Sequence, residues 1–330
     1  MIKRLSLMLI LILFFISCGK KEIKRIEQEK FFFGTYVKIV VYHTDEKLAK
    51  NAIDEAFKEI ERVDSKYNSK VEGSLVSRLN SSESKELEFD DEGIMLLNNL
   101  NRVYTLSAGK YDVTISPLLN LWGFTEDGAP VAIPEEEQIQ EILKKVDFSK
   151  VKIEGKMVKI EKPVEMIDTG SFLKGYALRR AKEVLKDRNI ESGFLTFISS
   201  IDTIGTKPDG KPWKIGLQNP NDPSEMIGIV ELNGQSMGVS GDYQTYVEID
   251  GVRYHHILDK ETGFPVRDKK MVVVINKDPF DADMYSTAFF SMETEDVLNY
   301  VNSKEDLEVL IVKANNEIVT SKNFKYEKVK

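Results

Sequence analysis

The segment from Ser240 to Pro265 holds most of the rare polar residues of this chain that could do chemistry. Two of the chain's three histidines, His255 and His256, stand next to each other in it. The residues before them alternate as a β-strand does and turn at Asp250-Gly251, so adjacent side chains must point to opposite faces. One histidine at most can therefore face a pocket. The alternative is that both are ordinary residues at the end of a strand.

The surroundings of the two histidines favour a pocket. Asp242 lies just before the hairpin, and Asp259 closely follows His256. The sequence Thr262-Gly263-Phe264-Pro265 is typical of a turn and would fix the chain beyond them. Carboxylates beside a histidine are the residue types that general acid and base catalysis uses.

Asp281, Asp283 and Thr287 form a second cluster, on a helix expected near residues 282–292. On a helix, Asp283 and Thr287 lie on the same face about one turn apart, and both present hard oxygen atoms. Mg²⁺ prefers such ligands and takes its remaining ones from water, backbone carbonyls and phosphates. Capping of the helix by Asp281 or Asp283 explains the same residues without a metal, so both interpretations stay open.

The sequence Asp168-Thr169-Gly170-Ser171 lies between a strand that ends at Ile167 and a helix expected over 172–185. The start of a helix offers free backbone N–H groups and a positive dipole, so a phosphate could dock there, with Lys174 as an added charge. Capping of the helix by Thr169 or Ser171 is the alternative. The glycine pattern matches neither the P-loop nor the dinucleotide fingerprint.

The elements that must position these residues mix hairpins and helices without a regular βαβ order, which predicts an α+β fold. We expect helices over 45–63, 91–107, from 134, over 172–185 and over 282–292. We expect strands over 36–42, 151–153, 157–160, 164–167, 194–198, 213–217, 227–232, 271–275 and 307–312, with the hairpin at 244–256.

Composition and charge predict one compact unit of sheet and helix, with a division into two lobes as the alternative. Hydrophobic residues make up 42% of the chain, which is ample for a large core. No linker rich in Gly, Ser or Pro divides it. Acidic residues outnumber basic ones by 54 to 46, and no basic face indicates nucleic-acid binding.

The N-terminus is typical of a targeting segment. Lys3 and Arg4 precede an apolar run, 5–16, that is too short to span a bilayer comfortably. The run ends in a sequence like a bacterial lipoprotein cleavage box, and Cys18 is the only cysteine of the chain, so lipidation is its simplest use. The alternatives are an ordinary secreted protein or an uncleaved N-terminal anchor.

We therefore predict a lipoprotein signal peptide over 1–17, a solvated tether over 18–30 and a folded domain over 31–330. Such a protein would be held by its lipid on the extracytoplasmic face of a bacterial membrane.

Several motifs follow one another in a fixed order along the mature chain. In sequence order they are Phe33-Gly34-Thr35, Ser65-Lys66-Tyr67, Ser77-Arg78-Leu79-Asn80, Gly109-Lys110-Tyr111-Asp112-Val113-Thr114, Pro117-Leu118, Leu121-Trp122-Gly123-Phe124, the run 168–177, Gly210-Lys211-Pro212-Trp213, Ser240-Gly241-Asp242-Tyr243, His256-Ile257-Leu258-Asp259, Thr262-Gly263, and Asp283 with Thr287. With them the chain resembles the ApbE-type flavin transferases, which are FAD:protein FMN transferases. Proteins of that kind cleave FAD and attach FMN through a phosphoester bond to a threonine of a target protein.

The resemblance implies a site for Mg²⁺ and for FAD as substrate. The metal would be held by the backbone carbonyl of Ser171 and by the side chains of Asp283 and Thr287. The FAD site would be lined by Phe33, Tyr67, Lys110, Tyr111, Asp112, Asp168, Lys174 and Ile257, whose rings suit a flat heterocycle and whose charges suit its N–H groups and phosphates. His256 and Asp259, with Asp242 as a further option, would activate or orient the threonine hydroxyl.

The resemblance predicts a transferase that releases AMP and that acts on a membrane-bound redox protein. Two other hypotheses are an Mg²⁺-dependent FAD pyrophosphatase that yields FMN and AMP, and a lipoprotein that binds FAD without chemistry. The chain departs from the family in three places. Ile198-Ser199-Ser200-Ile201-Asp202 stands where relatives often carry Gly-Gly followed by Asp or Asn, Phe33 replaces a usual Met, and Lys260 replaces a usual Pro.

Overall fold

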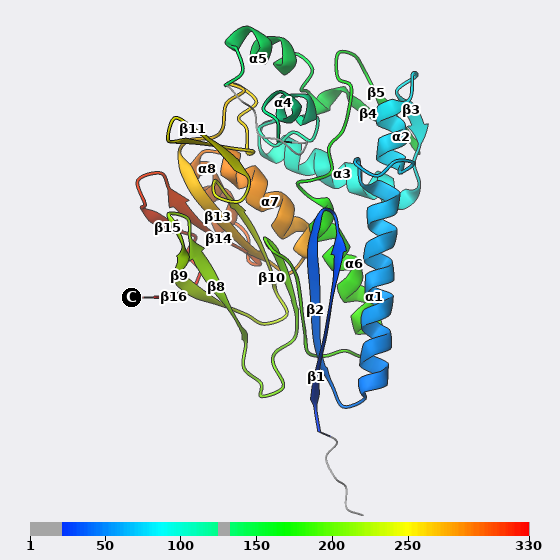
Figure 1. The fold of residues 1–330 in the computed structure, drawn as a ribbon, viewed down its shortest axis with the longest axis vertical. Coiled ribbons are helices and arrows are strands. Elements are labelled where there is room, and N and C mark those ends of the chain that lie inside the picture. Colours follow the sequence, from blue (N-terminus) through cyan, green and yellow to red (C-terminus); the bar gives the residue numbers. More distant parts are fainter. Residues whose placement is uncertain (1–21, 125–132, 330) are drawn as a thin grey trace, which may run out of the picture.

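The computed structural model describes residues 22–124 and 133–329. The predicted signal peptide, 1–17, and Cys18 lie outside these described residues. The largest element is an eight-stranded sheet in which every neighbouring pair is antiparallel (Figure 1). Its strands, in spatial order, are β1 (Lys24–Phe32), β2 (Thr35–His43), β6 (Gly193–Phe197), β7 (Ser200–Ile204), β10 (Ser236–Gly241), β13 (Lys269–Asn276), β14 (Leu307–Lys313) and β15 (Ile318–Thr320).

Strand β1 corrects the predicted tether over 18–30. Residues 24–32 pair with β2 along their whole length, from Lys24 opposite His43 to Phe32 opposite Thr35, so residues 24–30 of the predicted tether belong to the sheet. Only Ile26 of the strand is buried, because β1 is an edge strand that backbone hydrogen bonds hold to the sheet. Its exposed, charged side chains therefore resemble those of a solvated segment.

Helices cover one face of the large sheet, and most of the core lies beneath them. They include α1 (Glu46–Tyr67), α3 (Asp91–Leu106), α6 (Leu173–Asp187), α7 (Pro279–Ser291) and α8 (Thr294–Asn302). The first begins as predicted, because the Asp45 side chain accepts a hydrogen bond from the Leu48 N–H at 3.0 Å. Its apolar positions recur every three or four residues and form one buried face, as in Ile53, Phe57 and Ile60.

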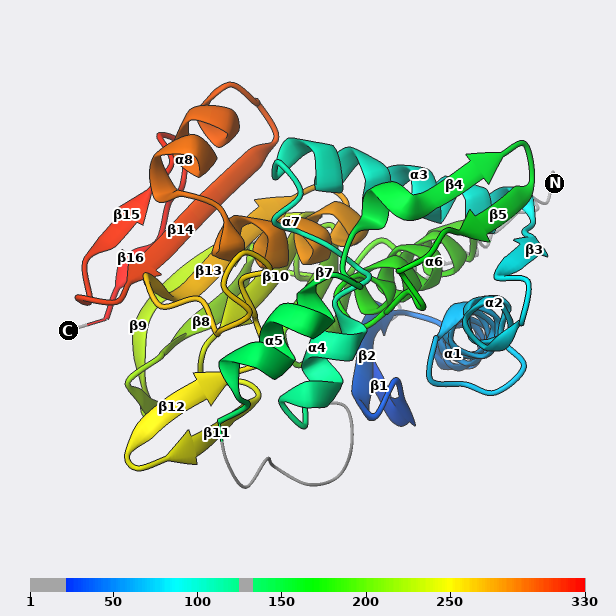
Figure 2. The ribbon, with the colours of Figure 1, turned by 90° about the horizontal axis from the view of Figure 1, so that it is seen from above.

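A small sheet covers the opposite face (Figure 2). It consists of β8 (Trp213–Asn219), β9 (Asp222–Leu232) and β16 (Glu327–Lys328). Strand β13 is buried on both sides: Val272 and Val274 belong to the core under the helices, and Val273 and Ile275 to the core under the small sheet. Helices on one face and strands on the other make the fold α+β, as predicted.

Shorter elements complete the described structure. They are α2 (Leu75–Ser81), α4 (Ser116–Leu121), α5 (Glu136–Leu143), the 3₁₀ turn Phe148–Lys150, the sheet of β3 (Glu86–Glu88), β4 (Val151–Glu154) and β5 (Met157–Ile160), and the hairpin of β11 (Tyr246–Ile249) and β12 (Val252–His255). No helix of the described residues is both long and apolar enough to cross a membrane.

The strand predicted over 164–167 is wrong. Val164 and Ile167 are buried as a strand pattern suggests, but the segment pairs with a side chain instead of a strand. The Asn80 amide donates to the Ile167 carbonyl at 2.9 Å and accepts from the Ile167 N–H at 2.9 Å. One asparagine thus replaces the neighbouring strand, which the alternation of apolar residues could not reveal.

Helix α7 lies very close to both the sheet and α6, and two glycines permit this. A Cβ atom at Gly238 of β10 would lie 2.2 Å from the Ala282 carbonyl oxygen. At Gly175 of α6, a Cβ atom would lie 2.5 Å from both the Asp283 Cβ and the Pro279 carbonyl oxygen. The backbones can approach this closely only because these residues carry no side chain.

Replacing Gly238 with alanine should therefore destabilise the protein. Gly238→Ala should lower the free energy of unfolding by about 1–3 kcal/mol, because the methyl group forces α7 away from the sheet. Gly193→Ala in β6 is the matched control, since its Cβ would first meet the flexible end of Ile204, at 3.2 Å. Urea denaturation measures both. Equal stability of the two variants would contradict this account of the packing.

Candidate functional site

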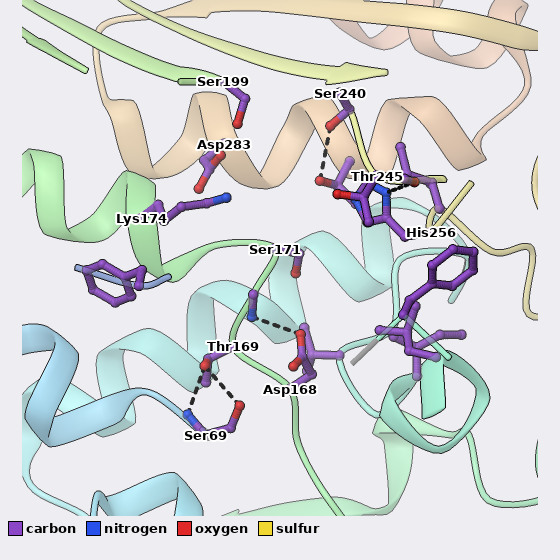
Figure 3. A pocket seen from close by; sticks show the side chains of 18 of the residues that line it. Ser69, Asp168, Thr169, Ser171, Lys174, Ser199, Ser240, Thr245, His256 and Asp283 are labelled. Atoms are coloured by element: carbon purple, nitrogen blue, oxygen red, sulfur yellow. Dashed lines mark hydrogen bonds between the residues drawn. The ribbon is translucent and has the colours of Figure 1, made fainter. Parts of the chain in front are cut away.

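A cavity of about 660 Å³ opens where the helical layer meets the large sheet, and this volume suits a medium-sized ligand. Its walls come from the β1–β2 turn, the end of α1, the start of α6, the β6–β7 turn, strand β10, helix α7 and the segment after β12. Figure 3 shows Lys174, Ser199 and Asp283 on one side, with His256 and Thr245 on the other. Eleven of the predicted site residues line this cavity: Phe33, Lys110, Tyr111, Asp112, Asp168, Ser171, Lys174, His256, Ile257, Asp283 and Thr287.

Asp283 lies at the centre of the side formed by α6, α7 and β7. Its Oδ2 accepts a hydrogen bond from the Gly175 N–H at 2.9 Å, and its Oδ1 accepts one from the Ser200 hydroxyl at 2.7 Å. Burial raises the pKa of the Asp283 carboxyl, against the opposing charge of Lys174. A cation near these oxygens would favour the charged form.

The capping alternatives do not hold. The N-cap of α7 is Asp278, which accepts from the Phe280 N–H at 3.0 Å, so neither Asp281 nor Asp283 caps it. The N-cap of α6 is Phe172, which makes no side-chain cap hydrogen bond. The Asp283 carboxylate thus takes an N–H group of the first turn of a different helix, α6.

The loop before α6 brings further polar atoms to the cavity. The Asp168 Oδ2 accepts from the Gly170 N–H at 2.8 Å, and burial raises the pKa of the Asp168 carboxyl. The Ser171 hydroxyl lies 2.9 Å from the Tyr111 hydroxyl. The Thr169 hydroxyl accepts from the Ser69 N–H at 3.0 Å, which ties the loop to the end of α1 (Figure 3).

The described residues could hold a metal ion only with help from a ligand or solvent. No group of three or more His, Cys, Asp or Glu side chains among them is arranged as a metal site. Asp283 and Thr287 provide a carboxylate and a hydroxyl, with the Thr287 Oγ1 at 3.2 Å from the Ser240 hydroxyl. One carboxylate with neutral oxygens fits Mg²⁺, which commonly takes its other ligands from water and phosphates.

His256 faces the cavity and His255 faces away, as the alternation along the strand predicts. The His256 Nδ1 lies 3.1 Å from the Thr245 carbonyl oxygen, which can only accept, so Nδ1 carries the proton and Nε2 is free to accept one. Desolvation lowers the pKa of His256 to about 4, so its ring is neutral at pH 7. The His255 ring is buried against Phe290, and its Nε2 donates to the Val266 carbonyl at 2.7 Å.

Two predicted catalytic carboxylates lie outside the cavity wall. The Asp259 side chain accepts from the Glu261 N–H at 2.7 Å and its carbonyl from the Gly263 N–H at 2.7 Å, so this residue shapes the turn after His256. Asp242 lies 3.5 Å from Arg253, and burial raises the pKa of its carboxyl. Proximity in sequence to His256 did not reveal that both side chains serve local structure.

Tyr67, predicted to contact FAD, is also outside the wall. It is the last residue of α1 and is almost fully buried. Its hydroxyl lies 2.9 Å from an Asp90 carboxylate oxygen and 2.8 Å from a Glu92 one, and its single proton can be donated to either, which fixes the ring beneath the start of α3. A tyrosine at the end of an amphipathic helix could equally belong to the core, and the structure assigns Tyr67 to the core.

Asp112 lines the cavity but its carboxylate is already in use. Its Oδ2 accepts from the Lys260 ammonium at 2.9 Å and from the Phe148 N–H at 3.0 Å, and its Oδ1 from the Thr114 hydroxyl at 2.6 Å. The fully buried carboxylate therefore fixes the loop that carries Lys110 and Tyr111. Lys260, one of the departures from the family, takes part in this structural pair.

The cavity is also lined by residues that were not among the predicted site residues. They include Asp64, Asn68 and Ser69 at the end of α1, Ser199 in the β6–β7 turn, Ser240 at the end of β10, and Gln244 and Thr245 before β11. Each follows or ends a regular element, and small polar residues at such positions are also usual in ordinary turns. No pattern in the sequence separates the two uses.

Comparisons with known proteins identify the family. The model of the ApbE family matches residues 33–311, so this chain belongs to the ApbE family. The FAD:protein FMN transferase of Vibrio cholerae is 29% identical over 272 residues, which cover 82% of this chain and 80% of that protein.

Solved structures agree with this assignment. The ApbE protein of Thermotoga maritima has a TM-score of 0.84 and 32% identity, over 93% of this chain and all of that one. The flavin transferase ApbE of Vibrio cholerae has a TM-score of 0.80 and 25% identity, over 92% of this chain and 99% of that one. The resemblance inferred from the motifs is therefore confirmed.

Proposed function

We propose that this protein transfers FMN from FAD to a threonine hydroxyl of an acceptor protein and releases AMP. The observation that carries the proposal is a single cavity in which Asp283 and Lys174 lie on one side and a neutral His256 lies on the other, with Thr287 also in its lining. The names of the relatives, FAD:protein FMN transferase, support the same reaction.

The residues of the cavity suit both the flavin ring and the pyrophosphate of FAD. FAD would lie along Phe33, Tyr111 and Ile257, whose apolar surfaces favour a flat heterocycle. The ammonium of Lys174 would approach the pyrophosphate and offset charge on its oxygens. Mg²⁺ held by Asp283, Thr287 and the Ser171 carbonyl would supply further charge stabilisation at the same phosphates.

His256 would act on the acceptor. Its Nε2 takes the proton of the threonine hydroxyl, the threonine oxygen forms a bond to the FMN phosphorus, and the bond between that phosphorus and the AMP oxygen breaks. The hydrogen bond from Nδ1 to the Thr245 carbonyl holds the required tautomer. The step is balanced, since the proton passes to His256 and the bridging oxygen leaves with AMP.

The two neighbouring histidines provide a test of this role. His256→Ala should bind FAD but transfer FMN about 100-fold more slowly or worse, because the base is lost. His255→Ala should retain transfer apart from a packing loss, because His255 faces the core. Mass spectrometry of an acceptor peptide incubated with FAD, Mg²⁺ and each variant gives both rates.

The same assay separates the alternatives. AMP and free FMN without a labelled peptide would indicate a pyrophosphatase, and bound FAD without AMP would indicate a binding protein. A loss confined to His255→Ala, or equal in both variants, would contradict the assignment of His256. Because the pKa of His256 is about 4, the wild-type rate should not fall between pH 8 and pH 6 through protonation of this ring.

The metal proposal predicts the behaviour of Asp283→Ala. This variant should release no AMP from FAD in the presence of Mg²⁺, because the one carboxylate of the proposed metal site is gone. Asp281→Ala, on the same helix, is the control, since Asp281 pairs with Arg102 instead of lining the cavity. AMP is measured by chromatography and the fold by circular dichroism. AMP release by a folded Asp283→Ala at the wild-type rate would rule out the metal assignment.

We also propose that Cys18 is lipidated and holds the enzyme on the extracytoplasmic face of a bacterial membrane, beside membrane-bound redox acceptors. The basic start, the short apolar run and the only cysteine of the chain support this. Cells given a labelled fatty-acid analogue should incorporate it into the wild type and not into Cys18→Ser. Label in both, or in neither, would count against a lipoprotein.

A further inference from the structure

Ser200 makes a buried contact to Asp283 that the proposed reaction does not yet explain. It is the first residue of β7, and its side chain is 1% exposed. Its hydroxyl donates to the Asp283 Oδ1 at 2.7 Å, so a residue of the sheet reaches the carboxylate on α7. This serine lies in the segment where the chain departs from the glycine-rich pattern of its family.

We propose that Ser200 is a positioning residue that orients the Asp283 carboxylate for a divalent cation, an inference that rests on the proposed function. A carboxylate on a buried helix can still rotate about its last side-chain torsion, which has broad energy wells. A single donor at one oxygen leaves part of this freedom. Two donors, the Gly175 N–H at Oδ2 and the Ser200 hydroxyl at Oδ1, fix the plane of the group.

The two hydrogen bonds leave capacity for a cation. A carboxylate has about four lone-pair positions, and the two donors of Asp283 occupy one on each oxygen. The remaining lone pairs belong to a carboxylate whose plane is already fixed by its hydrogen bonds to α6 and β7. A cation that binds there therefore does not have to order the side chain. The hydroxyl also compensates the buried carboxylate for lost water, which keeps Asp283 in place when no cation is present.

The turn before Ser200 gives this residue a fixed position. Residues 198 and 199 form a two-residue connection between Phe197 and Ser200, which pair across the hairpin. Ile198 has a φ of 32°, in the left-handed region that β-branched residues rarely adopt. The tight turn therefore sets Ser200 at the start of β7, beneath α7, with little freedom to move away from Asp283.

A matched pair of serines makes the proposal testable. Ser236 in β10 is also fully buried and also donates to an aspartate, Asp202, at 2.7 Å, but neither residue lines the cavity. Ser200→Ala and Ser236→Ala therefore each remove one buried serine-to-carboxylate hydrogen bond. Only the first should affect a cation at Asp283. Ser200→Gly is the second variant, for use if alanine at this position does not fold.

The experiment measures the binding of Mn²⁺ to the full mature protein in the presence of FAD. Free Mn²⁺ is detected by electron paramagnetic resonance. Ser200→Ala should raise the Kd for Mn²⁺ by about 10-fold or more, as for other residues that orient metal ligands. Ser236→Ala should leave this Kd unchanged, although thermal unfolding should show a lowered Tm in both variants.

The outcomes separate this inference from the proposed function. An unchanged Kd in folded Ser200→Ala or Ser200→Gly, an equal rise in Ser236→Ala, or a wild type that binds no Mn²⁺ with FAD would each overturn the positioning role. A selective rise in Ser200→Ala supports it even if the wild type transfers no FMN, and in that case only the proposed function fails.

Discussion

The arrangement of the site depends on the hydrogen bonds that the buried carboxylate of Asp283 accepts. Taking an ionised group out of water costs several kcal/mol unless hydrogen bonds replace the water. The donors come from two other elements, the Gly175 N–H of α6 and the Ser200 hydroxyl of β7. These two hydrogen bonds therefore hold α6 and the β6–β7 hairpin in place relative to α7. The cavity forms at this junction, so its shape follows from the same constraint.

Two glycines next to α7 allow the close approach that these hydrogen bonds require. Gly175 lets its own N–H come within hydrogen-bond distance of Asp283, since a Cβ there would collide with the Asp283 Cβ. Gly238 lets the sheet approach the other side of the helix. Most residues of α7 are buried, Asp283 and Ser286 among them, whereas the Asp281 side chain is 26% exposed. The polar side chains of α7 are either paired within the protein or directed into the cavity.

The sequence predicted features that depend on local periodicity and missed those that depend on distant partners. Alternation along a strand correctly separated His256 from His255, and helical spacing correctly placed Asp283 and Thr287 on one face. Tyr67 lies outside the cavity lining because its partners, Asp90 and Glu92, come from the start of another helix. Asp259 also lies outside that lining, because its carboxylate accepts a hydrogen bond within its own turn. The contact between Ser200 and Asp283 joins residues 83 positions apart, and no local pattern encodes it.

Burial shifts the pKa values of the acid and the base of this cavity in opposite directions, and each shift favours the neutral form of its group. It raises the pKa of Asp283 and lowers that of His256. A neutral His256 is already the form that accepts a proton, so it needs no further change before an acceptor arrives. For Asp283, the charge of Lys174 and the hydrogen bonds from Ser200 and Gly175 oppose the effect of burial. The cavity therefore keeps a neutral proton acceptor on one side and Asp283 and Lys174 on the other, so a hydroxyl and a phosphate could meet between them.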